Sequence, residues 1–392
     1  MFDMAGDDAV QFGLGEPDFQ PPDLAIDAFE KAMREGRNKY TTTAGLPELR
    51  QKIAETWHYL SPTLDESNVC ITMSGTNALL DIFLALVDPG DEVLIPEPYF
   101  PLYPPDVVIC GGQPSLYPCR FENGFVPKIE DLEDLVNENT VAILYNFPSN
   151  PTGGNVTPEE RDELPAFADR HDLWVITDEV YDRIVYDCEH VSFLGAGYDK
   201  VIMINSFSKT FAMTGWRIGY ILSENLEAMT HITKMQYYVT ACSNDAMQYA
   251  VLEAMEKASD YPAKMCQEFK ARRDLICDRL NSMEGVSCHV PTGAFYVFPK
   301  VDVPGMNSEE VAMALLEGGV LCSPGSAFGK AGEGHLRFAY TIGRDDISRG
   351  MDRVEKVLAK LRDIESVAHC LESKCCSTLS WGFQYSVMVL AS

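Results

Sequence analysis

Residues 141–178 read VAILYNFPSNPTGGNVTPEERDELPAFADRHDLWVITD and contain two apolar runs separated by an amphipathic stretch. The runs Val141–Tyr145 and Leu173–Thr177 are apolar throughout, which is typical of strands buried on both faces of a parallel sheet. Between them, residues 158–171 have the pattern of the helix that connects two such strands. Similar runs occupy residues 69–73, 92–95 and 201–205. We therefore predict an α/β fold in which a mostly parallel sheet is sandwiched by helices.

The pattern changes after Ser223, and this change predicts a second, smaller α+β domain. Residues 294–298 and 336–340 are predicted strands, and helical patterns cover residues 261–283, 308–317 and 345–361. A helical stretch at 23–33 precedes the polar residues 34–43, which we expect to join the two domains. The predicted parts are residues 1–35 and 277–365 for the small domain, 36–276 for the large domain, and 366–392 for a disordered or appended tail.

The charge balance excludes some classes of partner. Lys and Arg total 31 and Asp and Glu total 59, so the formal net charge is 31 − 59 = −28. Nucleic-acid binding is not expected, because it relies on clustered basic residues. The most apolar late stretch, residues 379–390, contains Gln384 and is shorter than the roughly 18 apolar residues of a membrane span. Since the N-terminus also lacks the features of a signal peptide, we predict a cytoplasmic protein.

The cysteines give no indication of a disulfide framework or a metal site. The chain has 12 cysteines, scattered along its length and without a Cys-x-x-Cys pair. In a cytoplasmic protein with an ample core, reduced thiols are expected. No group of cysteines and histidines has the spacing of a zinc site, so no metal is predicted.

Several polar groups follow directly after predicted strands. In open parallel sheets, chemistry collects beyond the carboxyl ends of the strands. Asn150 lies shortly after one strand, Asp178 immediately follows the next, and Lys209 lies four residues after Asn205. The segment Ser74-Gly75-Thr76-Asn77 separates another strand from its helix and offers backbone N–H groups to a phosphate. An amide, a carboxylate, an amine and an anion site are thus predicted to meet in one crevice.

Each of these features also has an ordinary explanation. The run that begins at Asn150 has the composition of a turn. Asp178-Glu179 resembles the magnesium-binding strand end of a P-loop nucleotidase, but residues 325–331, GSAFGKA, have the wrong spacing for the loop itself. Residues 13–18, GLGEPD, lack the third glycine of a dinucleotide fingerprint.

Three segments are more specific: NSFSKTFAMTGWRIGY at 205–220, YNFPSNPTG at 145–153 and TDEVY at 177–181. Together they resemble the class I aminotransferases, pyridoxal-phosphate enzymes of fold type I, and the resemblance runs from about Gly13 to about Ile364. It implies a transaminase that moves an amino group from an L-amino acid to a 2-oxoacid, by family habit often 2-oxoglutarate. The transfer would use a lysine Schiff base and pyridoxamine phosphate.

The resemblance also implies roles for the residues around the cofactor ring. Lys209 would hold pyridoxal phosphate and then move the proton at the substrate α-carbon. Asp178 would keep the pyridine nitrogen protonated, and Asn150 and Tyr181 would hydrogen-bond the ring oxygen. Phe100 would stack on the ring.

The remaining implied contacts concern the phosphate, the substrate and a second subunit. The phosphate would be bound by Gly75, Thr76, Asn77, Ser206, Ser208 and Arg217. Arg337 would bind the substrate α-carboxylate, with Gly15 and Asn150 nearby. The ordinary alternative is an arginine that points from its strand into solvent. Tyr40 matches a tyrosine that reaches the phosphate of the neighbouring subunit, which implies a homodimer.

Three alternatives stay open on the sequence. An α,β-eliminating lyase of the same fold would share every cofactor-binding motif. A regulatory module that binds the cofactor without turnover would normally carry an added DNA-binding region, and a catalytically dead homologue would lack some of the charged groups. In some aspartate-specific relatives a lysine stands at the position of Thr76, so aspartate preference is unsupported.

Overall fold

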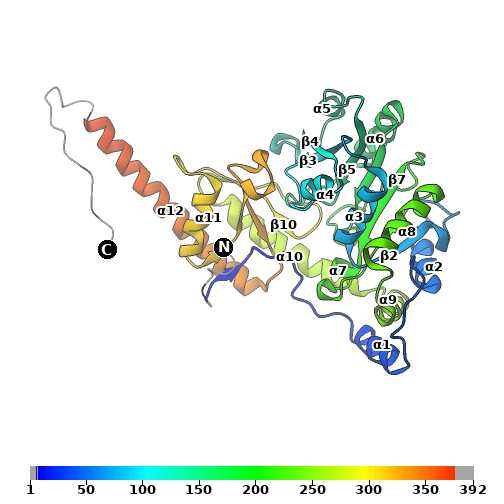
Figure 1. The fold of residues 1–392 in the computed structure, drawn as a ribbon. Helices are drawn as coiled ribbons and strands as arrows, with labels where there is room; N and C mark the ends of the chain where they lie inside the picture. The colour runs from blue at the N-terminus through cyan, green and yellow to red at the C-terminus, as the bar shows by residue number, and fades with distance from the viewer. Residues whose placement is uncertain (1–5, 7, 376–392) are drawn as a thin grey trace.

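The computed structural model describes residues 6 and 8–375, with side chains up to residue 363. Figure 1 shows two lobes. The larger contains a twisted central sheet, and the smaller contains helices α11 (Ser308–Glu317) and α12 (Arg344–Cys375) and the N-terminal strand. The long helix α10 (Tyr261–Asn281) runs between the lobes.

The central sheet has seven strands in the order β2-β8-β7-β6-β5-β3-β4. Each neighbouring pair from β7 to β4 is parallel, and only β8 runs against the others. The predicted mostly parallel sheet is therefore confirmed. In sheet order the strands are β2 (Val69–Thr72), β8 (Gly219–Leu222), β7 (Val201–Ser206), β6 (Trp174–Asp178), β5 (Thr140–Asn146), β3 (Glu92–Glu97) and β4 (Gln113–Pro118).

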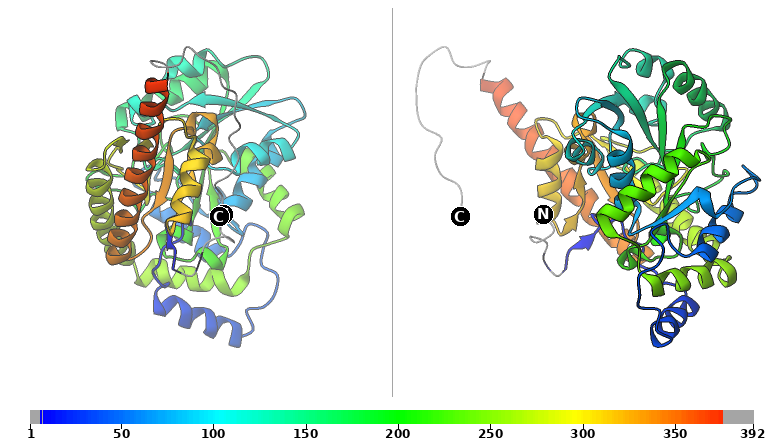
Figure 2. Two further views of the ribbon diagram at one scale, coloured as in Figure 1. Left: turned by 90° about the vertical axis from the view of Figure 1, so that its left-hand side faces the viewer. Right: turned by 45° about the vertical axis from the view of Figure 1, so that its right-hand side comes forward.

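Helices cover both faces of this sheet, which explains why its strands are apolar throughout (Figure 2). Along β5, Ala142 and Leu144 pack against one helical layer, whereas Ile143 and Tyr145 pack against the other. The first layer consists of α3 (Gly75–Leu86), α4 (Tyr103–Ile109) and α8 (Leu226–Thr240). The second consists of α2 (Pro47–Thr56), α5 (Ile129–Glu133), α6 (Pro158–His171) and α9 (Asp245–Lys257).

The small lobe is built on short strands from distant parts of the chain. A three-stranded antiparallel sheet has the order β10-β14-β13, and β1 pairs in parallel with β12. Phe12, next to β1, packs edge-on against Phe338 of β14, with ring centroids 5.6 Å apart. The strands are β1 (Val10–Gln11), β9 (Val286–Ser287), β10 (Tyr296–Val297), β11 (Lys300–Val301), β12 (Val320–Leu321), β13 (Ser323–Pro324) and β14 (Leu336–Ala339).

The predicted domain limits fall within continuous structure. Residue 276, the predicted end of the large domain, lies inside α10. Met265 and Phe269 of the same helix precede this residue, yet they already belong to the core of the small lobe. Helix α1 (Asp23–Arg34) lies against α9 of the large lobe, although β1 belongs to the small one. The division at these residues stays a prediction.

Helix α12 is longer than its predicted end at Leu361. It continues to Cys375, and no glycine or proline interrupts residues 351–375. Ten residues of the predicted tail thus continue the helix, while residues 376–392, including the apolar stretch 379–390, lie outside the described residues. Within the described part of the chain, no helix combines the length and apolarity that crossing a bilayer requires.

Candidate active site

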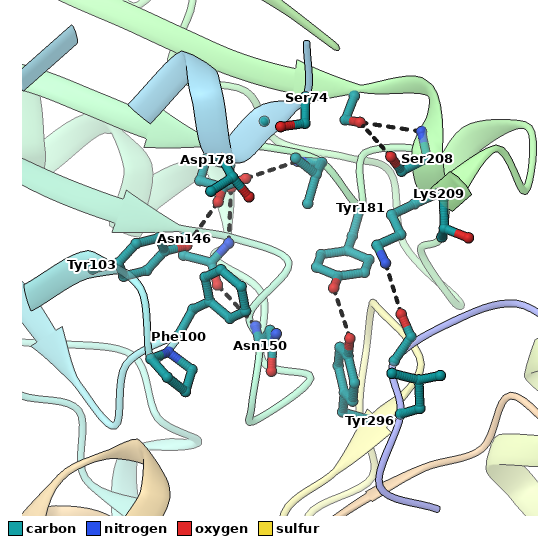
Figure 3. A pocket seen from close by; sticks show the side chains of 18 of the residues that line it. Ser74, Phe100, Tyr103, Asn146, Asn150, Asp178, Tyr181, Ser208, Lys209 and Tyr296 are labelled. Atoms are coloured by element: carbon teal, nitrogen blue, oxygen red, sulfur yellow. Dashed lines mark hydrogen bonds between the residues drawn. The ribbon is translucent and has the colours of Figure 1, made fainter. Parts of the chain in front are cut away.

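A cavity of about 490 Å³ lies where the two lobes meet the N-terminal segment (Figure 3). Its walls come from the carboxyl ends of the central strands, from Gly13–Gly15 and from the small lobe. Ser74, Asn146, Asp178 and Ser206 stand at the ends of β2, β5, β6 and β7, and all four line it. The predicted convergence at one edge of the sheet is thus present in the structure.

Lys209 lies within helix α7 (Phe207–Thr210), directly after β7. Its Nζ donates a hydrogen bond to the carbonyl oxygen of Gly15 at 2.7 Å. Burial lowers the pKa of Lys209 to about 8, and Arg217 and Arg337 act in the same direction against the opposing charge of Glu16. The pocket therefore contains an amine that loses its proton far more readily than an exposed lysine.

Asp178 is buried at the end of β6, with 6% of its surface exposed. Its Oδ2 accepts a hydrogen bond from the Tyr103 hydroxyl at 2.8 Å, and its Oδ1 accepts one from the Val180 N–H at 3.3 Å. Burial raises the pKa of Asp178 to about 6, although the bond from Tyr103 opposes the rise. This carboxylate therefore favours a cationic or proton-sharing partner in the pocket.

Asn150 occupies a loop that Asn146 holds in place. The Asn150 backbone N–H donates to Asn146 Oδ1 at 2.9 Å, and Asn146 Nδ2 donates to the Asp178 carbonyl oxygen at 3.1 Å. The side-chain oxygen of Asn150 accepts a hydrogen bond from Arg337 at 3.0 Å. Asn146 thus links the backbones of Asn150 and Asp178, and Asn150 in turn contacts Arg337.

Arg337 on β14 is buried, with 8% of its surface exposed, and is not a solvated strand arginine. Its guanidinium lies between the rings of Tyr296 and Phe328, 4.8 Å from each centroid. Its Nη2 donates to the Gly13 carbonyl oxygen at 2.6 Å and to Ser323 Oγ at 3.3 Å, whereas its buried Nε has no partner. A buried guanidinium N–H without a partner suits an incoming carboxylate.

The opposite end of the cavity has the features of an anion site. Gly75 and Thr76 begin the twelve-residue helix α3, and the first N–H groups of a helix have no partner inside it. The hydroxyl oxygens of Ser206 and Ser208 lie 2.9 Å apart beside this turn. Arg217 has a left-handed backbone, with φ of 54°, which is uncommon for residues other than glycine and clusters at functional sites.

Gly219 allows β8 to approach this anion site closely. A Cβ atom at Gly219 would lie 2.9 Å from the Gly75 nitrogen and 2.9 Å from the Asn205 oxygen. Both are backbone atoms, so a side chain here would displace the turn that begins α3.

Tyr181 and Tyr296 form a buried pair, with their hydroxyl oxygens 2.9 Å apart. Gly15 lies against this pair, because a Cβ atom at Gly15 would lie 2.0 Å from the Tyr296 hydroxyl oxygen. The N-terminal segment can therefore contact both Lys209 and Tyr296 only with glycine at this position.

Three predicted residues differ in their position relative to the cavity. Phe100 lines the cavity, and its ring meets that of Tyr103 edge-on. Asn77 is not among the lining residues; its side chain bonds the Met73 N–H and Asp81. Tyr40 also lies apart from the cavity of its own chain and is 89% exposed.

The sequence reasoning missed Tyr103, Asn146, Tyr296 and Ser323, all of which line the cavity. Asn146 directly follows the apolar run 141–145, so the rule that selected Asn150 also applies to it. Tyr103 lies three residues after Phe100, and no pattern marked it. Among the residues the structure describes, no cluster of His, Cys, Asp or Glu could hold a metal ion.

Comparisons with known proteins agree on one family. The family model described as aminotransferase class I and II matches residues 7–354. An aspartate aminotransferase of Pyrococcus horikoshii is 35% identical and covers 90% of this chain and 91% of its own. Aromatic-amino-acid aminotransferase 2 of Thermococcus litoralis is also 35% identical, with coverage of 91% and 94%.

A solved structure supports the same conclusion for the fold. The aromatic aminotransferase from Pyrococcus horikoshii OT3 superimposes with a TM-score of 0.87 at 35% identity, covering 91% of this chain and 96% of that one. The resemblance seen in the motifs is confirmed over nearly the whole chain. The chain belongs to the class I and II aminotransferases and is a transaminase of a family that uses pyridoxal phosphate.

Proposed function

We propose that this enzyme transfers the amino group of an L-amino acid to a 2-oxoacid, with 2-oxoglutarate as the acceptor, and that Lys209 binds the cofactor as a Schiff base. The observation that carries this proposal is the position of Lys209, a partly buried amine in a cavity that also contains a buried carboxylate and a guanidinium with a free N–H. The two half-reactions need these three groups: an amine, a partner for the ring nitrogen and a carboxylate receptor.

The cavity fits pyridoxal phosphate at both ends. The N–H groups of Gly75 and Thr76, the hydroxyls of Ser206 and Ser208, and Arg217 would hold its phosphate. Asp178 is a carboxylate whose pKa is raised by burial, so it fits a protonated pyridine nitrogen as its partner. When bound, the cofactor supplies an aldehyde that condenses with amines and a ring that withdraws electrons from the substrate α-carbon.

Lys209 performs two tasks in this proposal. With a pKa of about 8, a useful fraction of the side chain is the neutral amine near neutral pH, and only the neutral amine can attack an aldehyde. Once the substrate amine has replaced it, the same Nζ would take the proton from the substrate α-carbon and deliver it to the cofactor C4′, two bonds away. Its bond to the Gly15 carbonyl oxygen holds the side chain inside the cavity.

The substrate is oriented by Arg337, which binds the α-carboxylate through its free Nε–H and a neighbouring N–H. Because the guanidinium is fixed between Tyr296 and Phe328, binding requires little reorganisation of the arginine. Asn150 and Tyr181 would hydrogen-bond the ring oxygen, and Phe100 would stack on the ring.

We further propose a cytoplasmic homodimer in which Tyr40 reaches the phosphate of the neighbouring site. The support is the exposure of Tyr40, which is 89% in the single chain. This exposure leaves the Tyr40 side chain free to contact a second subunit. The cysteines whose side chains the structure describes are free thiols, which agrees with a reducing compartment.

The test uses Lys209→Ala, with Lys200→Ala as the control. Lys200 lies on the surface beside Asp172, so its loss should leave activity unchanged. We expect borohydride to fix the cofactor on wild type and Lys200→Ala, at the peptide that contains Lys209, and not on Lys209→Ala. Fixation on another lysine, or wild-type turnover by Lys209→Ala, would refute the assignment.

A panel of amino donors separates transamination from elimination. The donors include aspartate and the aromatic amino acids, which are named for two relatives of this chain. Without an acceptor, transamination should give a 2-oxoacid and pyridoxamine phosphate in an amount equal to that of the enzyme. Release of ammonia together with pyruvate would instead indicate a lyase.

A further inference from the structure

Tyr103 touches two of the residues expected to hold the cofactor ring. Its hydroxyl donates to Asp178 Oδ2 at 2.8 Å, and its ring meets Phe100 edge-on, with centroids 5.5 Å apart and planes at 72°. Figure 3 shows Tyr103 beneath Asp178, with the hydrogen bond between them. Tyr103 is only 1% exposed, so the contact is shielded from bulk water.

Few other groups stabilise the charge of Asp178. Within the described residues, Tyr103 is the only side chain that donates a hydrogen bond to this carboxylate, whose other oxygen accepts one from the Val180 N–H. Glu179 is a neighbouring acid that disfavours the charge, whereas Lys209 favours it. Tyr181 also lies within electrostatic range of Asp178 and is neutral, because burial holds its pKa well above the usual value.

We propose that Tyr103 is a positioning residue that acts on the cofactor through Asp178, holding the carboxylate ionised and leaving its Oδ1 edge for the ring nitrogen. This inference rests on the proposed role of Asp178. A donor on Oδ2 fixes the rotation of the carboxylate. It also makes the carboxylate less basic, because hydrogen bonding favours the charged form.

The consequence concerns the proton between Asp178 and the ring nitrogen. A less basic carboxylate leaves this proton on the nitrogen, where it increases the electron-withdrawing power of the ring. Without the Tyr103 hydroxyl the carboxylate is more basic, and the proton moves toward Asp178. The loss of one hydrogen bond to a charged group corresponds to about a tenfold change in such an equilibrium.

The experiment measures this proton directly. The holoenzyme is loaded with pyridoxal phosphate carrying ¹⁵N at the ring nitrogen, and the ¹⁵N chemical shift is recorded for wild type, Tyr103→Phe, Asp178→Asn and the double variant. We expect Tyr103→Phe to move the signal toward that of an unprotonated ring, and Asp178→Asn to move it further. The double variant should match Asp178→Asn, because Tyr103 acts through Asp178.

Tyr117→Phe is the matched control. Tyr117 is fully buried and its hydroxyl donates to the Leu144 carbonyl oxygen at 2.6 Å, yet it does not line the cavity. Its variant also loses a buried phenol hydrogen bond and should leave the signal unchanged. In steady-state assays, Tyr103→Phe should lower kcat about tenfold and leave KM for the amino acid unchanged, since Arg337 is untouched.

A second variant avoids any loss of packing. Fluorotyrosine at position 103 keeps the ring and makes the hydroxyl a stronger donor, so the signal should move in the direction opposite to that of Tyr103→Phe. The inference is overturned if Tyr103→Phe matches wild type, if fluorotyrosine leaves the signal in place, or if Tyr103→Phe has its full effect in the Asp178→Asn background. If Asp178→Asn itself leaves the signal unchanged, the proposed role of Asp178 fails instead.

Discussion

Arg337→Lys tests the proposed recognition of the substrate carboxylate. In the structure the guanidinium donates to Asn150, Gly13 and Ser323 and keeps one buried N–H free. A lysine retains the positive charge but cannot match the planar pair of donors that a carboxylate accepts. The substitution should therefore remove one charge-assisted hydrogen bond to the substrate while leaving the charge in place.

The expected magnitude follows from that single bond. A hydrogen bond to a charged group contributes about 1.5–3 kcal/mol, so kcat/KM for an L-amino acid should fall by about 10- to 150-fold. The assay follows the half-reaction of the holoenzyme with one amino acid under single-turnover conditions. In parallel, it uses the amine that results from decarboxylating this amino acid.

The amine has no carboxylate, so its slow reaction should be equally fast in wild type and Arg337→Lys. Arg272→Lys serves as a protein control, because Arg272 is also buried and binds Asp18 through two nitrogens outside the cavity. If Arg337→Lys slows the amine as much as the amino acid, or if Arg272→Lys reproduces the effect, the substitution acts through the fold and the assignment is wrong.

Three further predictions follow from the site. Because burial lowers the pKa of Lys209 to about 8, the rate of cofactor attachment to the apoprotein should rise about tenfold per pH unit below pH 8 and level off above it. A rate that still rises steeply at pH 9, as it does for the free ε-amine of Nα-acetyl-lysine, would contradict this prediction. Since the pKa of Asp178 is raised from 3.8 to about 6, its ionisation destabilises the folded apoprotein above pH 3.8, and Asp178→Asn should stabilise it at pH 7 by up to about 3 kcal/mol. Urea unfolding should show this gain at pH 7 and none below pH 3.8, and an equal gain at both pH values would exclude the ionisation as its cause. Gly219→Ala should weaken cofactor binding at least about tenfold, because its Cβ would press on the Gly75 nitrogen. The control is Gly215→Ala, where nothing lies within 4 Å of the added atom. Equal cofactor affinities for the two variants would refute the steric argument.

The elements that the sequence predicted best carry their own end signals. Helices α6 and α11 begin and end at the predicted residues, 158–171 and 308–317. Both have a capping box, in which Thr157 pairs with Glu160 and Asn307 with Glu310. The local sequence is therefore sufficient to predict the bounds of both helices.

Strands β4 and β8 were not predicted, because their identity depends on neighbours. Only one residue of β4, Tyr117, is buried, so the strand lacks an apolar run and owes its conformation to pairing with β3. Strand β8 runs antiparallel between β2 and β7, and nothing local in Gly219–Leu222 indicates that direction. The predicted strand at 294–298 shortens to Tyr296–Val297 because only these two residues pair with β14.

The residues of the candidate site also fall into those that the local sequence predicted and those that it did not. Asp178, Asn150 and Lys209 were predicted because each follows a strand in the sequence, and all three line the cavity. Tyr103 is different, since its hydroxyl reaches Asp178 across 75 positions of the chain. Contacts of this kind require the packing of α4 on the sheet, which no local pattern encodes.

The parallel pairing of β1 with β12 has a consequence for biosynthesis. Val10 is synthesised well before its partner Val320, so the two cannot pair until the small lobe has been made. The segment Gly13–Gly15 accordingly has no Arg337 or Tyr296 to contact until those residues have been synthesised. A nascent chain can thus assemble its anion site before it contains the residues that bind an amino acid.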